Sequence, residues 1–456
     1  MQTITNRRRQ DILEGNLPRI LLILAIPVML DNFMNAIFNL IDTIFVSSIG
    51  LDAVAAVTFV GPLNDIVKAI GTGLSITGTI MIGRAIGKAD KEEENRITKY
   101  LLIIAIVAGF LITGYIYFRW ESILISASIT DTLLPIAGQY FKMTSLSTPI
   151  VLINAIYFGQ KRAEGDTARI LRINAYSIVL KIITTYLLIY QFKVGLISLA
   201  ISTFLSQILI LVYACYNGFL ITIILIFKRN AVRIRIDLYK KIFYMGLPTV
   251  VEKVSLSYGF VMVNQVIIHY GDNVLAAYGI TNRINSVLFS TVAGIGTGLA
   301  IIITQNLAQN QIARVKSAIK LSMLVAVILS TVVGITLLIF KIPVANVMTR
   351  GEEDVLRHTL NAMSVYSISV IPWAIFQVII GIFQGYGKTK YNLLISFMRV
   401  YLFRLPVVAG LAFLLPNLNE FSVWYGMLVS NILTAVVAIG LYIYLTKRKK
   451  GLMHNS

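Results

Sequence analysis

The chain has 456 residues, of which 57% are hydrophobic and only 13% carry a charged side chain. In soluble domains about a quarter of the residues are charged, so this composition excludes an ordinary soluble protein. A formal net charge of +19 would suit a nucleic-acid partner, but the basic residues lie in alternate loops between apolar stretches, which argues against one.

Segments of about 20 or more mainly apolar residues follow one another along the chain, and each is long enough to cross a bilayer. Because backbone groups in lipid must be satisfied within their own segment, we predict that all of them are helices. The twelve segments cover residues 17–46, 53–82, 98–118, 133–158, 170–190, 195–227, 241–269, 274–307, 317–340, 357–385, 391–415 and 420–446. The predicted fold class is an all-α membrane protein.

The second half of the chain repeats the first at a spacing of about 221 residues, which is typical of transporters built from two like halves. The clearest matches pair residues 24–27 with 245–248, 71–74 with 296–299, and 165–167 with 387–389. Prolines also fall at paired positions inside the segments, Pro27 with Pro248 and Pro149 with Pro372. The pairing favours a shared working bend over kinks that are merely tolerated for packing.

We therefore predict two pseudo-symmetric six-helix lobes around a central cleft, with the substrate between them. An even number of helices in each half gives both halves the same orientation in the membrane. The N-lobe is assigned to residues 17–227 and the C-lobe to 241–446, joined by a basic linker at 228–240. Residues 1–16 and 447–456 are the terminal segments.

Basic residues mark one side of the membrane. They gather in alternate loops, within residues 7–9, 84–99, 161–172, 228–241, 314–320, 388–390 and 447–450. Positively charged loops stay in the cytoplasm, so the pattern predicts a multi-pass protein of the cytoplasmic (inner) membrane with both termini inside the cell.

Enzymes and metal sites have little support. Cys215 is a lone cysteine in an apolar segment, and the three histidines are scattered, so we expect no disulfide framework, metal or catalytic residue. The Gly71-Thr72-Gly73 run lacks the Lys-Ser/Thr of a phosphate-binding loop, which leaves no ATP site and no cofactor. The energy for transport would then come from an ion gradient or a partner.

The first segment carries two aspartates at membrane depth, where a charge costs about 2.5 kcal/mol or more. Asp31 and Asp42 are eleven residues apart and return to nearly the same helix face, with Asn35 and Phe38 between them and Asn39 beside them. For the aspartates a functional role is favoured, because a desolvated carboxylate takes up protons near neutral pH. For the asparagines, bonding to neighbouring helices is an equal alternative.

Other polar residues lie deep in later segments. Lys181 is about ten residues from each end of the fifth segment and is the best internal countercharge for an aspartate, and Glu252 is the repeat counterpart of Asp31. Scattered polar residues that line a cavity or bond neighbouring helices include Asn154, Thr203 and Asn264. Three arginines nearer helix ends are assigned mainly structural roles: Arg283, Arg399 and Arg404.

Four short runs carry a family resemblance: Leu24-Ala25-Ile26-Pro27, Phe38-Asn39-Leu40-Ile41-Asp42-Thr43, Ile82-Gly83-Arg84-Ala85-Ile86-Gly87 and Arg162-Ala163-Glu164-Gly165-Asp166-Thr167. With them the chain resembles the multidrug and toxic compound extrusion family, most closely its DinF-like bacterial branch. The resemblance implies export of small organic, often cationic, compounds in exchange for H⁺ or Na⁺. It also implies that Asp42 is the cation site, with Thr203 near it.

The chain departs from the family pattern close to this site. Phe38 stands where relatives often have tyrosine, and Lys181 and Thr185 stand where they often have asparagine and aspartate. A lysine beside Asp42 would weaken proton binding there or replace the bound cation. We therefore assign cation coupling to Asp42, Lys181, Asn39 and Thr203, and the substrate cleft to Asp31, Asn35, Phe38, Asn154, Glu252 and Asn264.

Three functions remain open from the sequence. The first is a monomeric antiporter for small organic compounds. Its partners would be the organic substrate, H⁺ or Na⁺, and the lipid bilayer. The second is a flippase for a lipid-linked or amphipathic substrate, which a strongly cationic cavity would favour. The third is a non-transporting receptor or assembly factor, which a cytoplasmic domain would have supported.

Overall fold

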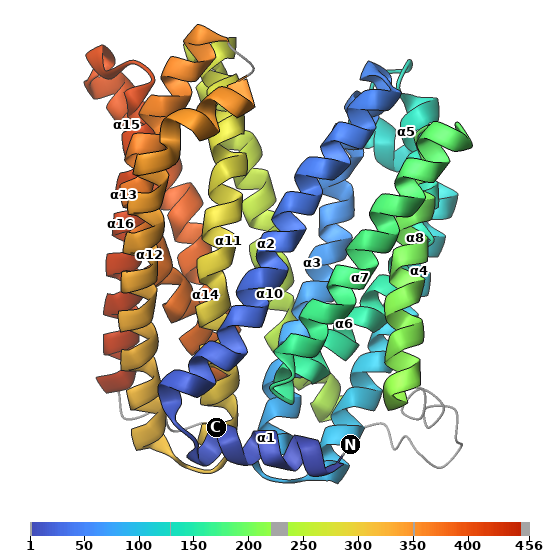
Figure 1. The fold of residues 1–456 in the computed structure, drawn as a ribbon, viewed down its shortest axis with the longest axis vertical. Helices are drawn as coiled ribbons and strands as arrows, with labels where there is room; N and C mark the ends of the chain where they lie inside the picture. The colour runs from blue at the N-terminus through green and yellow to red at the C-terminus, as the bar shows by residue number, and fades with distance from the viewer. Residues whose placement is uncertain (1, 128, 220–235, 350–351, 448–456) are drawn as a thin grey trace. The chain divides into compact units, whose positions relative to one another are not determined.

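The computed structural model describes residues 2–127, 129–219, 236–349 and 352–447. Within these ranges every regular element is a helix (Figure 1). The first half comprises α1 (Gln2–Glu14), α2 (Leu17–Ile49), α3 (Leu51–Gly87), α4 (Lys91–Ser126), α5 (Leu134–Ser145), α6 (Thr148–Ala163), α7 (Thr167–Tyr186), η1 (Leu187–Gln191), α8 (Ile197–Ala214) and η2 (Cys215–Phe219). The second half comprises α10 (Ile236–Ile267), η3 (Ile268–Tyr270), α11 (Asp272–Ala308), α12 (Ile312–Thr349), α13 (Glu353–Gly385), α14 (Thr389–Phe397), η4 (Met398–Arg404), α15 (Leu405–Leu414), η5 (Pro416–Leu418) and α16 (Phe421–Lys447).

The helices confirm the predicted all-α membrane fold. In the described part of the chain, ten helical stretches are long and apolar enough to cross a membrane. Two further segments complete the predicted twelve: the pair α5–α6, and α10, whose apolar run contains Glu252 and Lys253. Helices α3, α4 and α12 are 36 to 38 residues long, so they extend beyond the bilayer at their ends.

The fourth segment is two helices, where the sequence pattern predicted one at 133–158. A proline lacks the N–H that would donate to the carbonyl four residues earlier, and for Pro149 that carbonyl is Ser145. The hydroxyl of Thr113 in α4 donates to Ser145 O instead, at 2.8 Å. Pro149 therefore lies in the first turn of the separate helix α6, whereas its repeat counterpart Pro372 lies inside the continuous helix α13.

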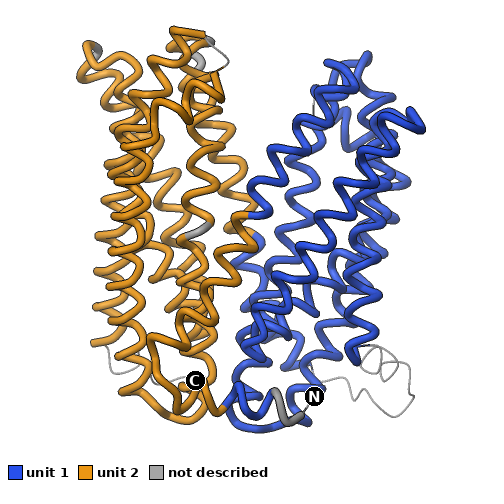
Figure 2. Tube along the Cα trace, in the orientation of Figure 1, with its two compact units in different colours: residues 1–9, 34–250 blue, residues 10–33, 251–456 orange. Residues whose placement is uncertain are grey.

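The chain forms two compact units (Figure 2). Unit 1 contains residues Met1–Arg9 and Met34–Val250, and unit 2 contains Gln10–Phe33 and Val251–Ser456. Helices α2 and α10 each contribute one part to each unit, because the division falls after Phe33 in α2 and after Val250 in α10. Most of the predicted linker at 228–240 falls on residues 220–235, which lie outside the described residues; α10 begins at Ile236.

Glycines lie where helices pack closely in both units. In unit 2, a Cβ atom on Gly296 of α11 would collide with the backbone oxygen of Gln377 in α13, and one on Gly381 would collide with Gly296. In unit 1, a Cβ on Gly159 of α6 would lie 2.6 Å from the backbone oxygen of Ser75 in α3. Glycines thus allow the helix backbones to touch, as small residues do between helices in membranes.

The charged loops of unit 1 meet at one end. Arg9 donates to the backbone oxygen of Gly87 at 2.9 and 3.2 Å, next to the α3–α4 turn. Arg8 forms an ion pair of 2.6 Å with Asp166, which Arg169 also contacts at 2.9 Å. Glu164 forms an ion pair with Lys161 at 2.7 Å. Both acidic residues of the Arg162–Thr167 run therefore take part in ion pairs.

Candidate functional site

The two ionisable residues predicted to pair in the N-lobe lie together in unit 1. The Nζ atom of Lys181 in α7 is 3.8 Å from Oδ1 of Asp42 in α2, and their side chains are 15% and 26% exposed. Phe38 lies one helical turn before Asp42, is buried, and places its ring centre 4.3 Å from the same Nζ atom. An ammonium group over an aromatic face is a favourable cation–π contact. Lys181 therefore has an anionic and an aromatic partner, both from α2.

The ion pair is held by charge and not by a hydrogen bond. The 3.8 Å between Lys181 Nζ and Asp42 Oδ1 exceeds the donor–acceptor distance of a charge-assisted hydrogen bond, which is about 2.7–2.9 Å. In the described part of the chain, Oδ1 of Asp42 is buried and receives no hydrogen bond. A carboxylate oxygen of this kind can accept a proton or an incoming cation without first losing a donor.

A second pair of charges lies near the middle of α3. Lys68 binds Asp65 at 2.9 Å, both side chains are more than half exposed, and the charge of Lys68 acts on Lys181. Sequence reasoning missed Asp65 and Lys68, although both stand inside the predicted segment 53–82, where a charge is costly. That position was the signal that could have identified them. Unit 1 thus groups two lysines and two aspartates from three helices.

Hydrogen bonds between polar side chains connect α8 with α6 and with α7. Thr185 donates to Ser202 at 2.7 Å, and both side chains are buried. Asn154 donates to the backbone and side-chain oxygens of Gln207, each at 2.9 Å. Thr203 donates to Leu199 O of its own helix at 2.7 Å. Asn154 and Thr203 therefore have structural bonds, and their predicted functional roles remain predictions.

The other predicted site residues are distributed over both units. Asn35 and Asn39 are exposed on α2 within unit 1, and Asn264 is exposed on α10 within unit 2. Asp31 is buried and belongs to unit 2, as does Glu252, whose Oε1 accepts a hydrogen bond from Ser396 at 2.9 Å. Their assignment to a substrate cleft remains a prediction.

Unit 2 also contains two buried arginines on the π-helical segment η4. The guanidinium carbon of Arg404 lies 6.0 Å from the ring centre of Phe260, and that of Arg399 lies 5.0 Å from the ring centre of Phe376. Their residues are 5% and 8% exposed. The structural roles predicted for them remain predictions.

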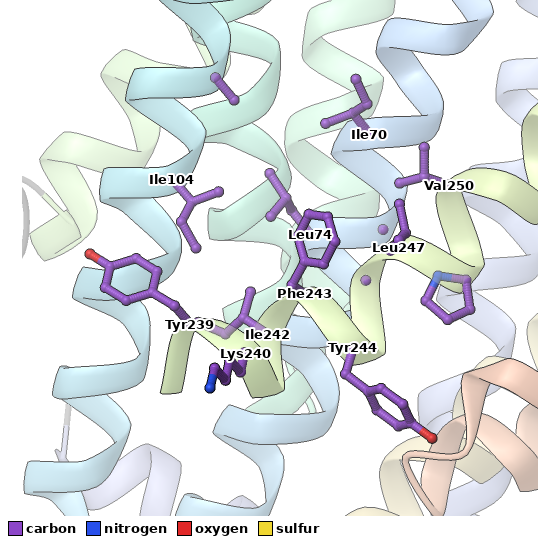
Figure 3. A pocket seen from close by; sticks show the side chains of 14 residues that line it. Ile70, Leu74, Ile104, Tyr239, Lys240, Ile242, Phe243, Tyr244, Leu247 and Val250 are labelled. Carbon is purple, nitrogen blue, oxygen red and sulfur yellow. The ribbon is translucent and has the colours of Figure 1, made fainter. Parts of the chain in front are cut away.

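An apolar pocket of about 850 Å³ lies in unit 1, between the first half of α10 and helices α3 and α4. Figure 3 shows Ile70 and Leu74 of α3, Ile104 of α4, and Phe243 and Leu247 of α10 around this space. Lys240 supplies the charged group among its lining residues. The volume is in the range of small-molecule sites.

Comparison with known proteins gives the family. The MatE family model matches residues 27–187 and 248–409, one stretch in each half of the chain. A FAD transporter of Shewanella oneidensis is 24% identical over 413 residues, which cover 88% of this chain and 89% of that protein. A probable multidrug resistance protein NorM of Thermotoga maritima is 22% identical over 430 residues, covering 91% and 90% of the two chains.

Solved structures have the same fold. An outward-facing multidrug resistance MATE family transporter of the MOP superfamily superimposes with a TM-score of 0.89 at 21% identity, over 96% of this chain and 98% of that one. A MOP superfamily transporter from Pyrococcus furiosus, whose binding pocket is described as having reverse polarity, gives a TM-score of 0.88 at 22% identity, over 96% and 98%. Two matched halves, a twelve-helix membrane fold and relatives that align along most of their length lead to one conclusion: the chain belongs to the multidrug and toxic compound extrusion (MATE) family of membrane transporters.

Proposed function

We propose that this protein is a cation-coupled antiporter that exports small organic compounds, cationic or amphipathic, across the cytoplasmic membrane by alternating access. It would act as a monomer with both termini in the cytoplasm, and the substrate would bind between the two lobes. The observation that carries the proposal is the 3.8 Å pair of Asp42 and Lys181, a charge pair that an incoming H⁺ or Na⁺ can separate. Relatives named as multidrug resistance and export proteins support the substrate class.

The pair supplies a switch with two states. When a cation binds Asp42, the carboxylate no longer attracts Lys181, and the ammonium keeps only its contact with Phe38. Because both groups come from different helices, α2 and α7, losing the attraction frees α2 to bend at Pro27. One proton that enters across about 100 mV releases about 2.3 kcal/mol, enough for about fiftyfold uphill export of a neutral solute.

The test is transport by the purified protein in proteoliposomes, with H⁺ and Na⁺ gradients imposed separately on a fluorescent amphipathic substrate such as ethidium. We expect one of the two gradients to drive ethidium export, and Asp42→Asn to abolish the dependence on that gradient while the protein still reconstitutes normally. Asp354→Asn, which changes an exposed aspartate of unit 2, is the control and should transport as the wild type does. Full gradient-driven export by Asp42→Asn would refute the coupling role.

The apolar pocket favours a second candidate, a flippase for an amphipathic or lipid-linked substrate. Its lining is almost entirely hydrocarbon, with Lys240 as the charged member, which suits an acyl chain with an acidic head group. The same proteoliposomes distinguish the two functions. A flippase would move a fluorescent phospholipid between leaflets without any ion gradient, and the antiporter would not.

A further inference from the structure

The charged site of unit 1 has a counterpart in unit 2 that lacks the carboxylate. Phe38, Asp42 and Lys181 correspond to Phe260, Asn264 and Arg404, because each counterpart lies 222 or 223 residues later, at the spacing of the internal repeat. The geometry repeats as well: Lys181 lies over the ring of Phe38, and Arg404 lies over the ring of Phe260. Unit 2 therefore keeps the cation and the aromatic ring, and has an amide where unit 1 has Asp42.

Arg404 consequently has no anionic partner in the described part of the chain. It is 5% exposed, and its side chain donates hydrogen bonds to two neutral oxygens, Ser430 Oγ at 3.4 Å and Asn431 Oδ1 at 3.2 Å. Asn431 is held in place by its own bond to Ser369, at 2.7 Å. A guanidinium group has five N–H donors and cannot lose its charge in a protein, so these contacts leave most of its binding capacity unused.

Arg399 adds a second charge on the same π-helical segment. Its Nε atom is buried and has no hydrogen-bond acceptor among the described residues. The charges of Arg404 and Glu252 both act on it, and the carboxylate of Glu252 is also occupied by the hydroxyl of Ser396. Arg399 thus lies in the field of one carboxylate and of a second guanidinium group. A π-helical turn is itself a frequent feature of functional sites, since it redirects side chains that an α-helix would separate.

We propose that Arg399 and Arg404 form a subsite for the acidic group, a carboxylate or a phosphate, of an amphipathic substrate. A buried charge without a counterion is costly, and an arriving anion offsets that cost. Arginine binds carboxylates and phosphates with two parallel hydrogen bonds, and the rings of Phe260 and Phe376 offer apolar surface beside the charges. In unit 1 the lysine is already paired with Asp42, so an acidic substrate would be recognised in unit 2.

The inference adds compounds with an acidic group to the amphipathic substrates of the proposed transporter, and it rests on that proposed function. Its test measures binding without any ion gradient, so failed antiport and failed acid recognition give separate results. The probe is 1-pyrenebutyrate, an aromatic carboxylate, and its matched neutral control is 1-pyrenebutanol. Both are titrated by fluorescence into the purified full-length protein in an uncharged detergent.

We expect the wild type to bind pyrenebutyrate about tenfold or more tightly than pyrenebutanol, the advantage that charged hydrogen bonds provide. Arg404→Met and Arg399→Met should remove this preference and leave pyrenebutanol binding unchanged. Arg357→Met, an exposed arginine of the same unit, is the control and should keep the preference. Equal binding of the acid and the alcohol by the wild type, or an unchanged preference in Arg404→Met, overturns the proposal.

A second variant keeps the test informative if removal of a buried arginine prevents folding. Asn264→Asp restores the missing carboxylate at an exposed position of α10 and should neutralise Arg404. We expect it to fold and to lose the preference for the acid; a folded Asn264→Asp protein with wild-type preference contradicts the proposal. Competition with octanoate and with dioctanoyl phosphatidic acid then distinguishes a free acid from a lipid head group as the source.

Discussion

Asp42 and Lys181 are close enough to attract each other, and the attraction is weak enough for a bound cation to break it. At 3.8 Å they attract each other without the geometry of a direct hydrogen bond, and both side chains keep some access to solvent. Removing one partner of a fully buried ion pair lowers the stability of a protein by several kcal/mol, and removing one partner of an exposed pair changes it very little. This pair lies between the two limits, which suits a switch that must open and close in every transport cycle.

The first residue-scale prediction is an energetic coupling between these two side chains. Asp42→Asn and Lys181→Met should each lower the stability by about 1–2 kcal/mol, and the double variant should cost about 1 kcal/mol less than their sum. Thermal unfolding of the four proteins in one detergent gives the cycle. The exposed pair of Asp354 and Arg357, with 3.6 Å between charged atoms, is the matched control and should show coupling near zero. Strict additivity at Asp42 and Lys181 would show that the attraction is absent in solution.

At the scale of elements, hydrophobic length identified the helices and could not identify how they break. Apolar segments predict a span because a bilayer needs about 20 apolar residues, and this criterion led to the twelve segments. The break between α5 and α6 depends on a hydroxyl from another helix, Thr113 of α4, which replaces the N–H that Pro149 lacks. Pro149 is visible within the segment itself, but the hydroxyl from α4 that replaces its N–H is not.

The candidate site shows the same limit. Asp42 and Lys181 could be paired from the sequence, because two opposite charges at membrane depth have few other partners. The contacts of Thr185 with Ser202 and of Asn154 with Gln207 depend on the register between packed helices, which composition does not reveal. Arg404 was assigned a structural role from its place near a helix end, and the sequence does not reveal its contact with the ring of Phe260.

The glycine contacts lead to a prediction about helix packing in unit 2. Gly296→Ala should lower stability by about 1–3 kcal/mol, because the new methyl group would meet the backbone oxygen of Gln377, which cannot rotate away. Gly279→Ala, in the same helix α11, is the control: no heavy atom lies within 4 Å of its added Cβ. That change should be neutral or stabilising by up to about 1 kcal/mol, since alanine is the better helix former. Equal unfolding temperatures for the two variants would mean that α11 and α13 do not touch at Gly296.

For the whole molecule, part of α1 is bound beside basic turns within each of the two units. In unit 1, Arg8 and Arg9 attach the middle of α1 to the turns that follow α6 and α3. In unit 2, Arg314 donates to Gly15 O, so the end of α1 lies at the α11–α12 turn. All these turns belong to the basic set that the positive-inside rule places in the cytoplasm. Since α1 runs from unit 1 into unit 2, each unit carries its basic turns at the end where α1 is bound.

This arrangement predicts the sidedness of two lysines that differ in their surroundings. Lys193 lies in the turn between η1 and α8, at the other end of α7 from the α6–α7 turn. Lys240 is the last residue of the predicted basic linker and lies near the start of α10. One membrane crossing separates the α6–α7 turn from Lys193, and α8 with η2 returns the chain before Lys240. Lys193→Cys and Lys240→Cys, each made in a Cys215→Ser background, should therefore react from opposite sides with a membrane-impermeant maleimide. In intact cells the reagent should label the first and spare the second, and inside-out vesicles should reverse the result. Labelling of both from the same side would contradict an even number of crossings in each half, and with it the equal orientation of the two halves. The correspondence of Asp42 with Asn264 and of Lys181 with Arg404 depends on that equal orientation.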